Sequence, residues 1–171
     1  FNAKIIGATH DLVCAYKPNT AFYEAYGAEG IVALRRTIED IRTIAPDVPV
    51  ILDAKRADIG NTNVGYAKFA FDYLGADAIT VHPYLGAEAL RPFLDRNDKG
   101  VFVLCRTSNS GAGEFQDLEV RYRDHLSHLH PEANLWRSLY SYVAQNVAKK
   151  WDEYGNCGLV VGATYPDELA E

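Results

Sequence analysis

Short apolar runs that alternate with amphipathic segments are the feature that most limits how this chain can fold. The runs Val48–Leu52 and Val101–Leu104 are apolar and about strand length, as in parallel sheets whose two faces are both covered. From Ile31 to Ala45, apolar residues recur at three- and four-residue steps, which is the spacing of one helix face. Strands alternating with helices predict an α/β protein built from parallel βα units.

The expected elements follow one another in regular order. We expect five strands, at 11–16, 48–52, 78–81, 101–104 and 159–161. We expect helices at 28–45, 65–74, 86–94 and 135–147. Pro46 and Gly75 follow the first two helices and are residue types that end helices. Segment 119–131 lacks periodicity, so we expect a polar insertion there.

Length and charge restrict the class of protein. A chain of 171 residues with 48% apolar and 23% charged residues predicts a single folded domain, 1–171. The net charge is −6 with no long block of either sign, so neither a nucleic-acid partner nor an anionic membrane surface is indicated. No apolar run approaches the roughly 20 residues of a membrane helix.

Cysteine and histidine positions bear on redox state and metals. Cys14, Cys105 and Cys157 form no C-x-x-C pair and adjoin apolar runs, which predicts buried, reduced thiols in a cytoplasmic protein. Three histidines stand close together in the insertion, His125, His128 and His130. Because no cysteine or paired carboxylate accompanies them, we expect a solvated loop rather than a metal site.

The two ends of the sequence suggest a piece of a larger protein. No Met occurs, even at position 1, and 166–171 read as the first turn of a helix. We therefore expect either a fragment or only the ordered residues of a longer chain.

Charged residues gather at one expected strand end. Asp53 and Lys55 are two residues apart, so strand periodicity puts both on one face, and Asp58 follows on the loop. Lys17 stands at the equivalent end of the first expected strand. Alternating cations and anions can hold a lysine as a proton donor. Taken alone, a D-x-K-x-x-D pattern more often means a salt-bridge network on a loop.

The stretch around these residues is longer than a three-residue pattern. Residues 52–62 (LDAKRADIGNT) resemble the signature of the orotidine 5′-phosphate decarboxylase family. Four further segments are similar to its bacterial type 2 subgroup: 15–24 (AYKPNTAFYE), 79–86 (ITVHPYLG), 105–109 (CRTSN) and 158–164 (GLVVGAT). They occur in the family's order and cover nearly the whole chain. The resemblance implies a (β/α)8 TIM barrel of which this chain holds about five βα units, the second to the sixth.

The resemblance also implies catalytic roles and no cofactor or metal. Lys55 would protonate C6 of the pyrimidine as the carboxylate of orotidine 5′-monophosphate leaves. Asp53 would position Lys55 and put negative charge near the departing carboxylate. Lys17 would complete the charge network and contact the ribose. The strands expected to be missing carry, in the family, a ribose-binding aspartate and the phosphate site.

Other positions are implied to bind substrate. Asp58, Ile59 and Thr62 resemble residues donated by the neighbouring subunit, so a homodimer with shared active sites is implied. Ser108, with Thr107 beside it, resembles the residue that reads the pyrimidine ring.

Three alternatives remain beside this hypothesis. A related sugar-phosphate decarboxylase would hold Mg²⁺ with an acidic residue where this chain has Lys17, whose charge would repel the ion. Lys55 as a Schiff-base nucleophile would need a neutral amine, whereas flanking aspartates favour the charged form. The third alternative is an inactive fragment or a nucleotide-binding module of the same fold.

Overall fold

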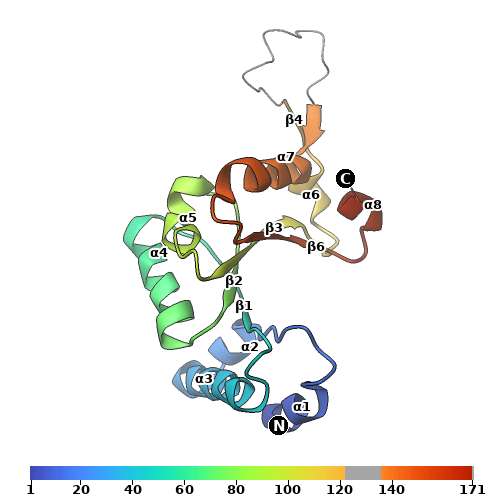
Figure 1. The fold of residues 1–171 in the computed structure, drawn as a ribbon. Coiled ribbons are helices and arrows are strands. Elements are labelled where there is room, and N and C mark those ends of the chain that lie inside the picture. The colour runs from blue at the N-terminus through green and yellow to red at the C-terminus, as the bar shows by residue number, and fades with distance from the viewer. Residues whose placement is uncertain (122–135, 171) are drawn as a thin grey trace.

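A parallel four-stranded sheet forms the centre of the molecule (Figure 1). The computed structural model describes residues 1–121 and 136–170. The strand order is β1-β2-β3-β6. The strands of this sheet are β1 (Ile51–Arg56), β2 (Ala78–Val81), β3 (Gly100–Arg106) and β6 (Cys157–Val161). A separate antiparallel pair joins β4 (Glu119–Arg121) to β5 (Trp136–Ser138).

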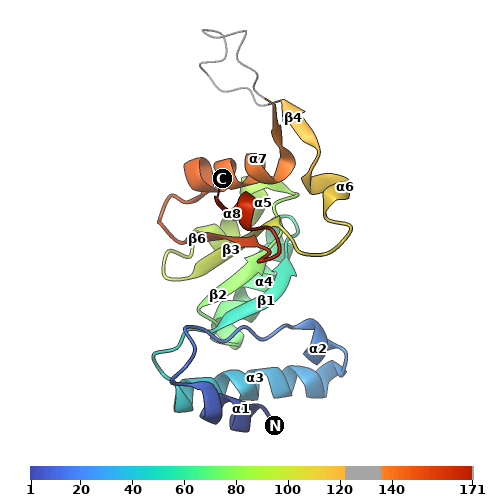
Figure 2. The same ribbon diagram turned by 90° about the vertical axis from the view of Figure 1, so that its right-hand side faces the viewer.

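The helices lie mainly on one side of the sheet, and those between β1 and β6 connect its successive strands (Figures 1 and 2). The longer ones are α1 (Asn2–Thr9), α3 (Gly27–Ile44), α4 (Gly60–Ala67), α5 (Gly86–Leu94) and α7 (Leu139–Asn146). The short ones are α2 (Ala21–Glu24), α6 (Gly113–Gln116) and α8 (Pro166–Ala170). Two π-helical turns, η1 (Lys68–Tyr73) and η2 (Val147–Trp151), extend α4 and α7.

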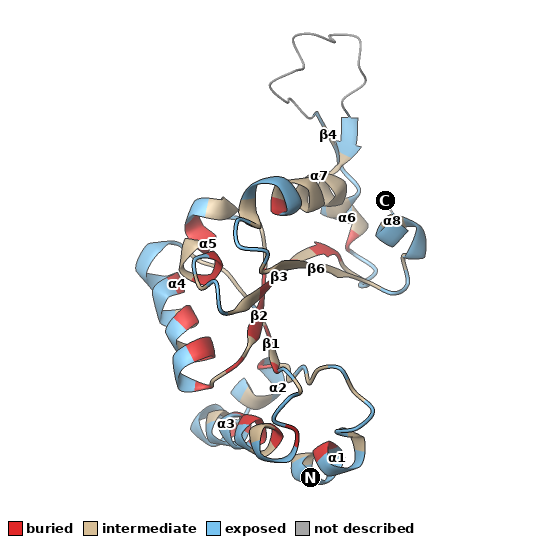
Figure 3. Cartoon of the chain, viewed as in Figure 1, coloured by how far each residue is buried: buried red, intermediate tan, exposed pale blue. Residues whose placement is uncertain are grey.

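The hydrophobic core lies between the sheet and these helices (Figure 3). Leu34 and Ile38 from α3, Phe93 from α5 and Val101 from β3 are at most 1% exposed. Each such side chain stabilises the fold by about 1.5–3 kcal/mol through removal of apolar area from water. All of β2 is buried, whereas every residue of the edge strand β6 is half-buried.

The expected α/β class is confirmed. β1, β2 and β3 are each followed by a helix, and the next strand of the sheet lies parallel beside them. The helix expected at 28–45 corresponds to α3, and the strand at 78–81 and the helix at 86–94 match β2 and α5. These elements show a clear apolar pattern in the sequence, which explains the agreement.

The prediction of a strand at 11–16 is wrong. Residues 16–19 instead run beside β1 through two isolated parallel bridges, Tyr16 to Val50 and Asn19 to Asp53. Pro18 accepts from the Asp53 N–H but has no N–H to donate, so the ladder stays incomplete.

Two helix starts also differ from expectation. α4 begins at Gly60, five residues before the expected start. Its first turn contains no apolar residue until Val64, so periodicity could not reveal it. The helix expected from 135 begins at Leu139, because residues 136–138 form β5. Of the insertion expected at 119–131, the first three residues form β4. The remainder, with its three histidines, lies outside the described residues.

The cysteine prediction is partly wrong. All three are free, and Cys105 is buried and Cys157 half-buried, but Cys14 is exposed. Burial raises the pKa of Cys105 to about 11, and burial together with the nearby Asp152 raises that of Cys157 to about 11. None of the helices in the described ranges has the length and apolar character needed to cross a membrane.

Candidate active site

Asp53 is the centre of a charged cluster at the carboxyl end of β1. Its Oδ2 accepts a 2.5 Å hydrogen bond from Nζ of Lys17, and its Oδ1 accepts one of 2.6 Å from Nζ of Lys55. Asp53 is only 6% exposed, whereas about half of each lysine side chain is exposed. One buried carboxylate therefore holds two ammonium groups at the surface of the site.

The electrostatics of the cluster favour a charged Asp53. Burial alone would raise the pKa of this carboxyl, but hydrogen bonds from Lys17, Lys55 and Thr80 outweigh burial and lower it below its ordinary value. Asp53 is consequently an anion at neutral pH. The carboxylate of Asp53 and the ammonium groups of Lys17 and Lys55 together carry one net positive charge. This charge suits an anionic ligand.

A bulge in β1 aims Lys55 at Asp53. Between the pairs Leu52–Ile79 and Arg56–Val81, three residues of β1 oppose the single residue Thr80 of β2. Lys55 has φ +48° and is the one non-glycine residue with positive φ in the described part of the chain. Such a conformation is costly for a residue with a Cβ and is enriched at functional sites. The two side chains thus meet as expected, but through a bulge instead of regular strand alternation.

Thr80 is a member of the cluster that sequence reasoning missed. Its Oγ1 accepts from the backbone N–H of Lys55 at 2.9 Å and lies 3.0 Å from Oδ1 of Asp53, to which it donates. It is 3% exposed. A hydroxyl within an otherwise apolar buried strand was the available signal, because a buried polar group requires a partner.

Lys17 is brought to the cluster by the segment that runs along β1. Asp53 donates its backbone N–H to the carbonyl of Pro18 at 2.9 Å, and its carbonyl accepts from the N–H of Thr20 at 3.2 Å. These bonds on either side of Asn19 fix the register of the segment. The expected proximity of Lys17 to Asp53 is therefore present even though the expected strand is not.

Asp58, Ile59 and Thr62 form no hydrogen bond or ion pair with this cluster among those of the described residues. Asp58 lies just before α4, where its N–H donates to Oδ1 of Asn63 and its Oδ1 accepts from the N–H of Ile59. Within the described ranges, no hydrogen bond or ion pair joins Asp58 to either lysine. Ile59 is 63% exposed and Thr62 is also exposed.

Thr107 and Ser108 form the start of the loop after β3. Thr107 is half-buried and Ser108 exposed. The strand that carries them is parallel to β1 and separated from it by β2, so the loop emerges at the same edge of the sheet as the cluster. Gly162, after β6, lies against this loop, because a Cβ there would be 2.9 Å from the Cβ of Ser108.

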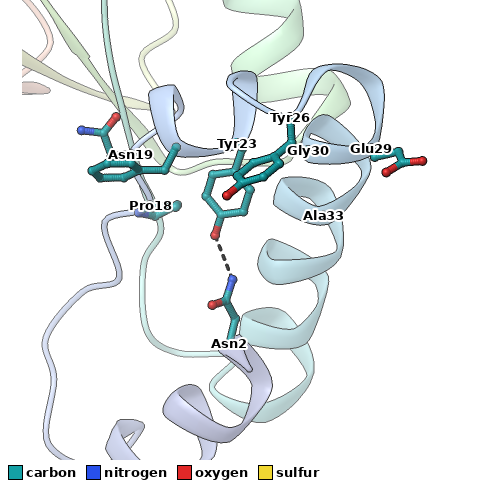
Figure 4. Close-up of a pocket in the computed structure, with 9 residues that line it drawn as sticks. Asn2, Pro18, Asn19, Tyr23, Tyr26, Glu29, Gly30 and Ala33 are labelled. Atoms are coloured by element: carbon teal, nitrogen blue, oxygen red, sulfur yellow. Dashed lines mark hydrogen bonds between the residues drawn. The ribbon is translucent and has the colours of Figure 1, made fainter.

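A separate hollow of about 530 Å³ lies between the start of α1, α2 and α3 (Figure 4). Tyr23 and Tyr26 face it from α2 and the turn that follows, and the hydroxyl of Tyr23 accepts a 2.9 Å hydrogen bond from Asn2 (Figure 4). None of the three charged residues of the cluster lines it. In the described part of the chain, no three His, Cys, Asp or Glu side chains gather as metal ligands would.

The fold and the cluster together define a class: a partial (β/α)8 barrel with a charged site at the carboxyl ends of its strands. The chain belongs to the orotidine 5′-phosphate decarboxylase / HUMPS family, whose model matches residues 2–171. The fold class expected from the sequence is thereby confirmed as a partial barrel.

Individual relatives agree with this membership. The chain is 53% identical over 170 residues to orotidine 5′-phosphate decarboxylase from Herpetosiphon aurantiacus, covering 99% of this chain and 58% of the relative. It is 54% identical to the enzyme of that name from Thermomicrobium roseum, covering 99% of this chain and 55% of the relative. The chain thus spans somewhat more than half the length of these curated relatives.

Solved structures show the same architecture. A structure of Leishmania donovani OMP decarboxylase superposes with a TM-score of 0.84 at 44% identity, covering 99% of this chain and 61% of that one. A structure of orotidine 5′-monophosphate decarboxylase from Methanocaldococcus jannaschii has a TM-score of 0.67 at 24% identity, covering 98% and 67%. The latter supports the fold alone.

Proposed function

We propose that the protein carrying this chain decarboxylates orotidine 5′-monophosphate to uridine 5′-monophosphate, a step of pyrimidine biosynthesis, in the cytoplasm. The observation that carries the proposal is the cluster of Lys17 and Lys55 on the buried carboxylate of Asp53. It lies at the segment that resembles the family signature, and the curated relatives bear the name of this enzyme.

The cluster has the groups that this reaction needs. When the bond between C6 and the carboxylate breaks, carbon dioxide leaves and the electron pair stays on C6. The ammonium of Lys55 donates a proton to C6 and becomes neutral, and solvent can restore the proton because the side chain is 47% exposed. Asp53 holds Lys55 in position, and its negative charge repels the substrate carboxylate until carbon dioxide departs.

Substrate recognition is assigned to the neighbouring residues. Lys17 contacts the ribose, and Ser108 with Thr107 reads the pyrimidine ring. No cofactor or metal takes part in this scheme. A divalent cation at the Asp53 carboxylate is disfavoured, because both oxygens already accept hydrogen bonds from ammonium groups.

The active unit is a homodimer with shared sites. Asp58, Ile59 and Thr62 act in the partner's site, with Asp58 joining the charge network there and Thr62 contacting the sugar-phosphate. Supporting this arrangement, Ile59 is 63% exposed and the carboxylate of Asp58 bonds only locally, to the N–H of Ile59, among the interactions of the described residues.

Replacement of the proton donor tests the proposal. In the full-length natural protein, Lys55→Ala should abolish turnover of orotidine 5′-monophosphate, while Lys68→Ala, which removes an exposed lysine of η1, should leave it unchanged. Residual activity within about tenfold of wild type would contradict the assignment. Borohydride treatment in the presence of substrate should leave no adduct on Lys55, whereas a mass increase there would favour a Schiff-base enzyme.

A further inference from the structure

The first residue after β3 is held by a two-point hydrogen-bonded contact from α6. The backbone N–H of Thr107 donates to Oε1 of Gln116 at 2.9 Å, and Nε2 of Gln116 donates to Oγ1 of Thr107, also at 2.9 Å. The Thr107 hydroxyl in turn donates to Oδ1 of Asn109 at 2.7 Å. A primary amide has both the acceptor and the donor that this contact needs.

Arg106 also contacts the side chain of Gln116. Its Nη1 lies 3.4 Å from Oε1 of Gln116, and its Nη2 forms an ion pair of 3.2 Å with Asp117. The ring of Tyr165 is 4.0 Å from the guanidinium carbon, which is close enough for a cation–π interaction. Arg106 is only 5% exposed, so the amide of Gln116 lies against a buried guanidinium group.

The backbone of Ser108 lies against the chain at the end of β6. The N–H of Gly162 donates to the carbonyl of Arg106 at 2.7 Å. A Cβ on Gly162 would lie 2.9 Å from the Cβ of Ser108 and 3.1 Å from its N and Cα. The backbone of Ser108 therefore packs directly on the chain at Gly162. The residue before Ser108, Thr107, is held by its two hydrogen bonds with Gln116.

From this geometry we infer that Gln116 is a positioning residue for recognition of the pyrimidine ring. It acts through Thr107, by holding the backbone at which Ser108 leaves the strand. The inference rests on the proposed function, in which Ser108 and Thr107 read the base. Gln116 and Asp117 directly precede Leu118 and β4, so α6 also connects the loop that begins at Thr107 to the antiparallel pair of β4 and β5.

The test separates the base from the rest of the ligand. In the full-length natural protein, the affinities for uridine 5′-monophosphate and for ribose 5-phosphate, which lacks the base, are measured by calorimetry. Gln116→Ala should weaken binding of the nucleotide by about tenfold or more, because a misplaced polar group loses its contact. Binding of ribose 5-phosphate should stay within about twofold of wild type, because no contact to the ribose or the phosphate changes.

Two further variants serve as controls. Glu114→Ala truncates an exposed side chain on the same helix and should change neither affinity. Gln116→Glu keeps an acceptor for the Thr107 N–H but loses the donor to Oγ1, so its loss of nucleotide affinity should be intermediate. Because Gln116→Glu is nearly isosteric, it still tests the role of Gln116 if Gln116→Ala fails to fold.

Each outcome has a distinct meaning. Equal losses for the nucleotide and for ribose 5-phosphate, or unchanged nucleotide affinity in both Gln116 variants, would overturn the inference and leave the proposed function intact. A wild-type protein that neither binds uridine 5′-monophosphate nor turns over orotidine 5′-monophosphate would overturn both.

Discussion

Thr80 and Asp53 are joined by a hydrogen bond of 3.0 Å between two side chains that are both buried. The same hydroxyl of Thr80 accepts from the backbone N–H of Lys55. One side chain on β2 therefore controls both the carboxylate of the cluster and the backbone of the bulge that presents the lysine.

Replacement of Thr80 by Val should damage both the stability and the site. The variant keeps the shape of the side chain but leaves the Lys55 N–H without its acceptor, which should cost about 1–3 kcal/mol of unfolding free energy. Turnover should fall at least about tenfold, because Lys55 and Asp53 lose their common anchor. Urea denaturation and steady-state kinetics measure the two effects. Thr80→Ser retains the hydroxyl and should stay close to wild type, and a Val variant equal to the Ser variant would refute this role.

At position 55, a glycine variant should be more stable than an alanine variant, which is the reverse of the usual order in a strand. In a regular strand, glycine is less stable than alanine by about 0.5–1 kcal/mol. At φ +48°, a Cβ is unfavourable by about 1–2 kcal/mol. Since Lys55→Gly and Lys55→Ala both remove the amine, the Gly variant should be the more stable of the two by about 0.5–1 kcal/mol in chemical denaturation. An Ala variant of higher stability would mean that the backbone relaxes once the lysine is removed.

Asp53 should contribute a distinct pH dependence to stability. Its pKa in the folded protein lies below the ordinary 3.8, so folding favours the carboxylate. The resulting stabilisation is present above the unfolded-state pKa and disappears as the pH falls through the folded-state pKa. The stability difference between wild type and Asp53→Asn should therefore shrink as the pH falls below about 5.

The control for this measurement is Asp47→Asn, at an exposed position before β1. This variant leaves the cluster of Lys17, Asp53 and Lys55 intact, so the effect of pH on Asp53→Asn is judged against it in the same measurement. A wild-type to Asp53→Asn difference that does not change with pH would contradict a stabilising charge at Asp53.

Subunit exchange should reveal where Asp58 acts. If it serves the partner's site, a mixture of Lys55→Ala and Asp58→Ala proteins should regain activity, because each heterodimer has one site with both defects and one with neither. At equal mixing, recovery should reach up to about a quarter of wild-type activity, since half of the dimers are mixed and half of their sites are intact. Absence of recovery after demonstrated exchange would assign Asp58 to its own subunit's site.

Elements with a local pattern were predictable from the sequence. β2 and α5 begin and end where expected, because apolar spacing and the flanking turn residues are local properties of the chain. The proximity of Lys17, Asp53 and Lys55 was also expected, since parallel strands bring their carboxyl ends to one edge of a sheet. The family resemblance of 52–62 agrees with the family match over the whole chain.

Contacts between distant parts of the chain were decided only by the tertiary structure. Thr80 and Asp53 are separated by 27 residues in sequence, so no local pattern reveals that they bond. The positive φ of Lys55 accompanies the mismatch between β1 and β2 around Thr80. Cys14 is exposed and lies just before residues 16–19, which form the isolated bridges beside β1. Residue types and their spacing determined which groups this protein has for chemistry. The orientation of those groups depends on strand register and packing between distant residues, and these contacts form only when the chain folds.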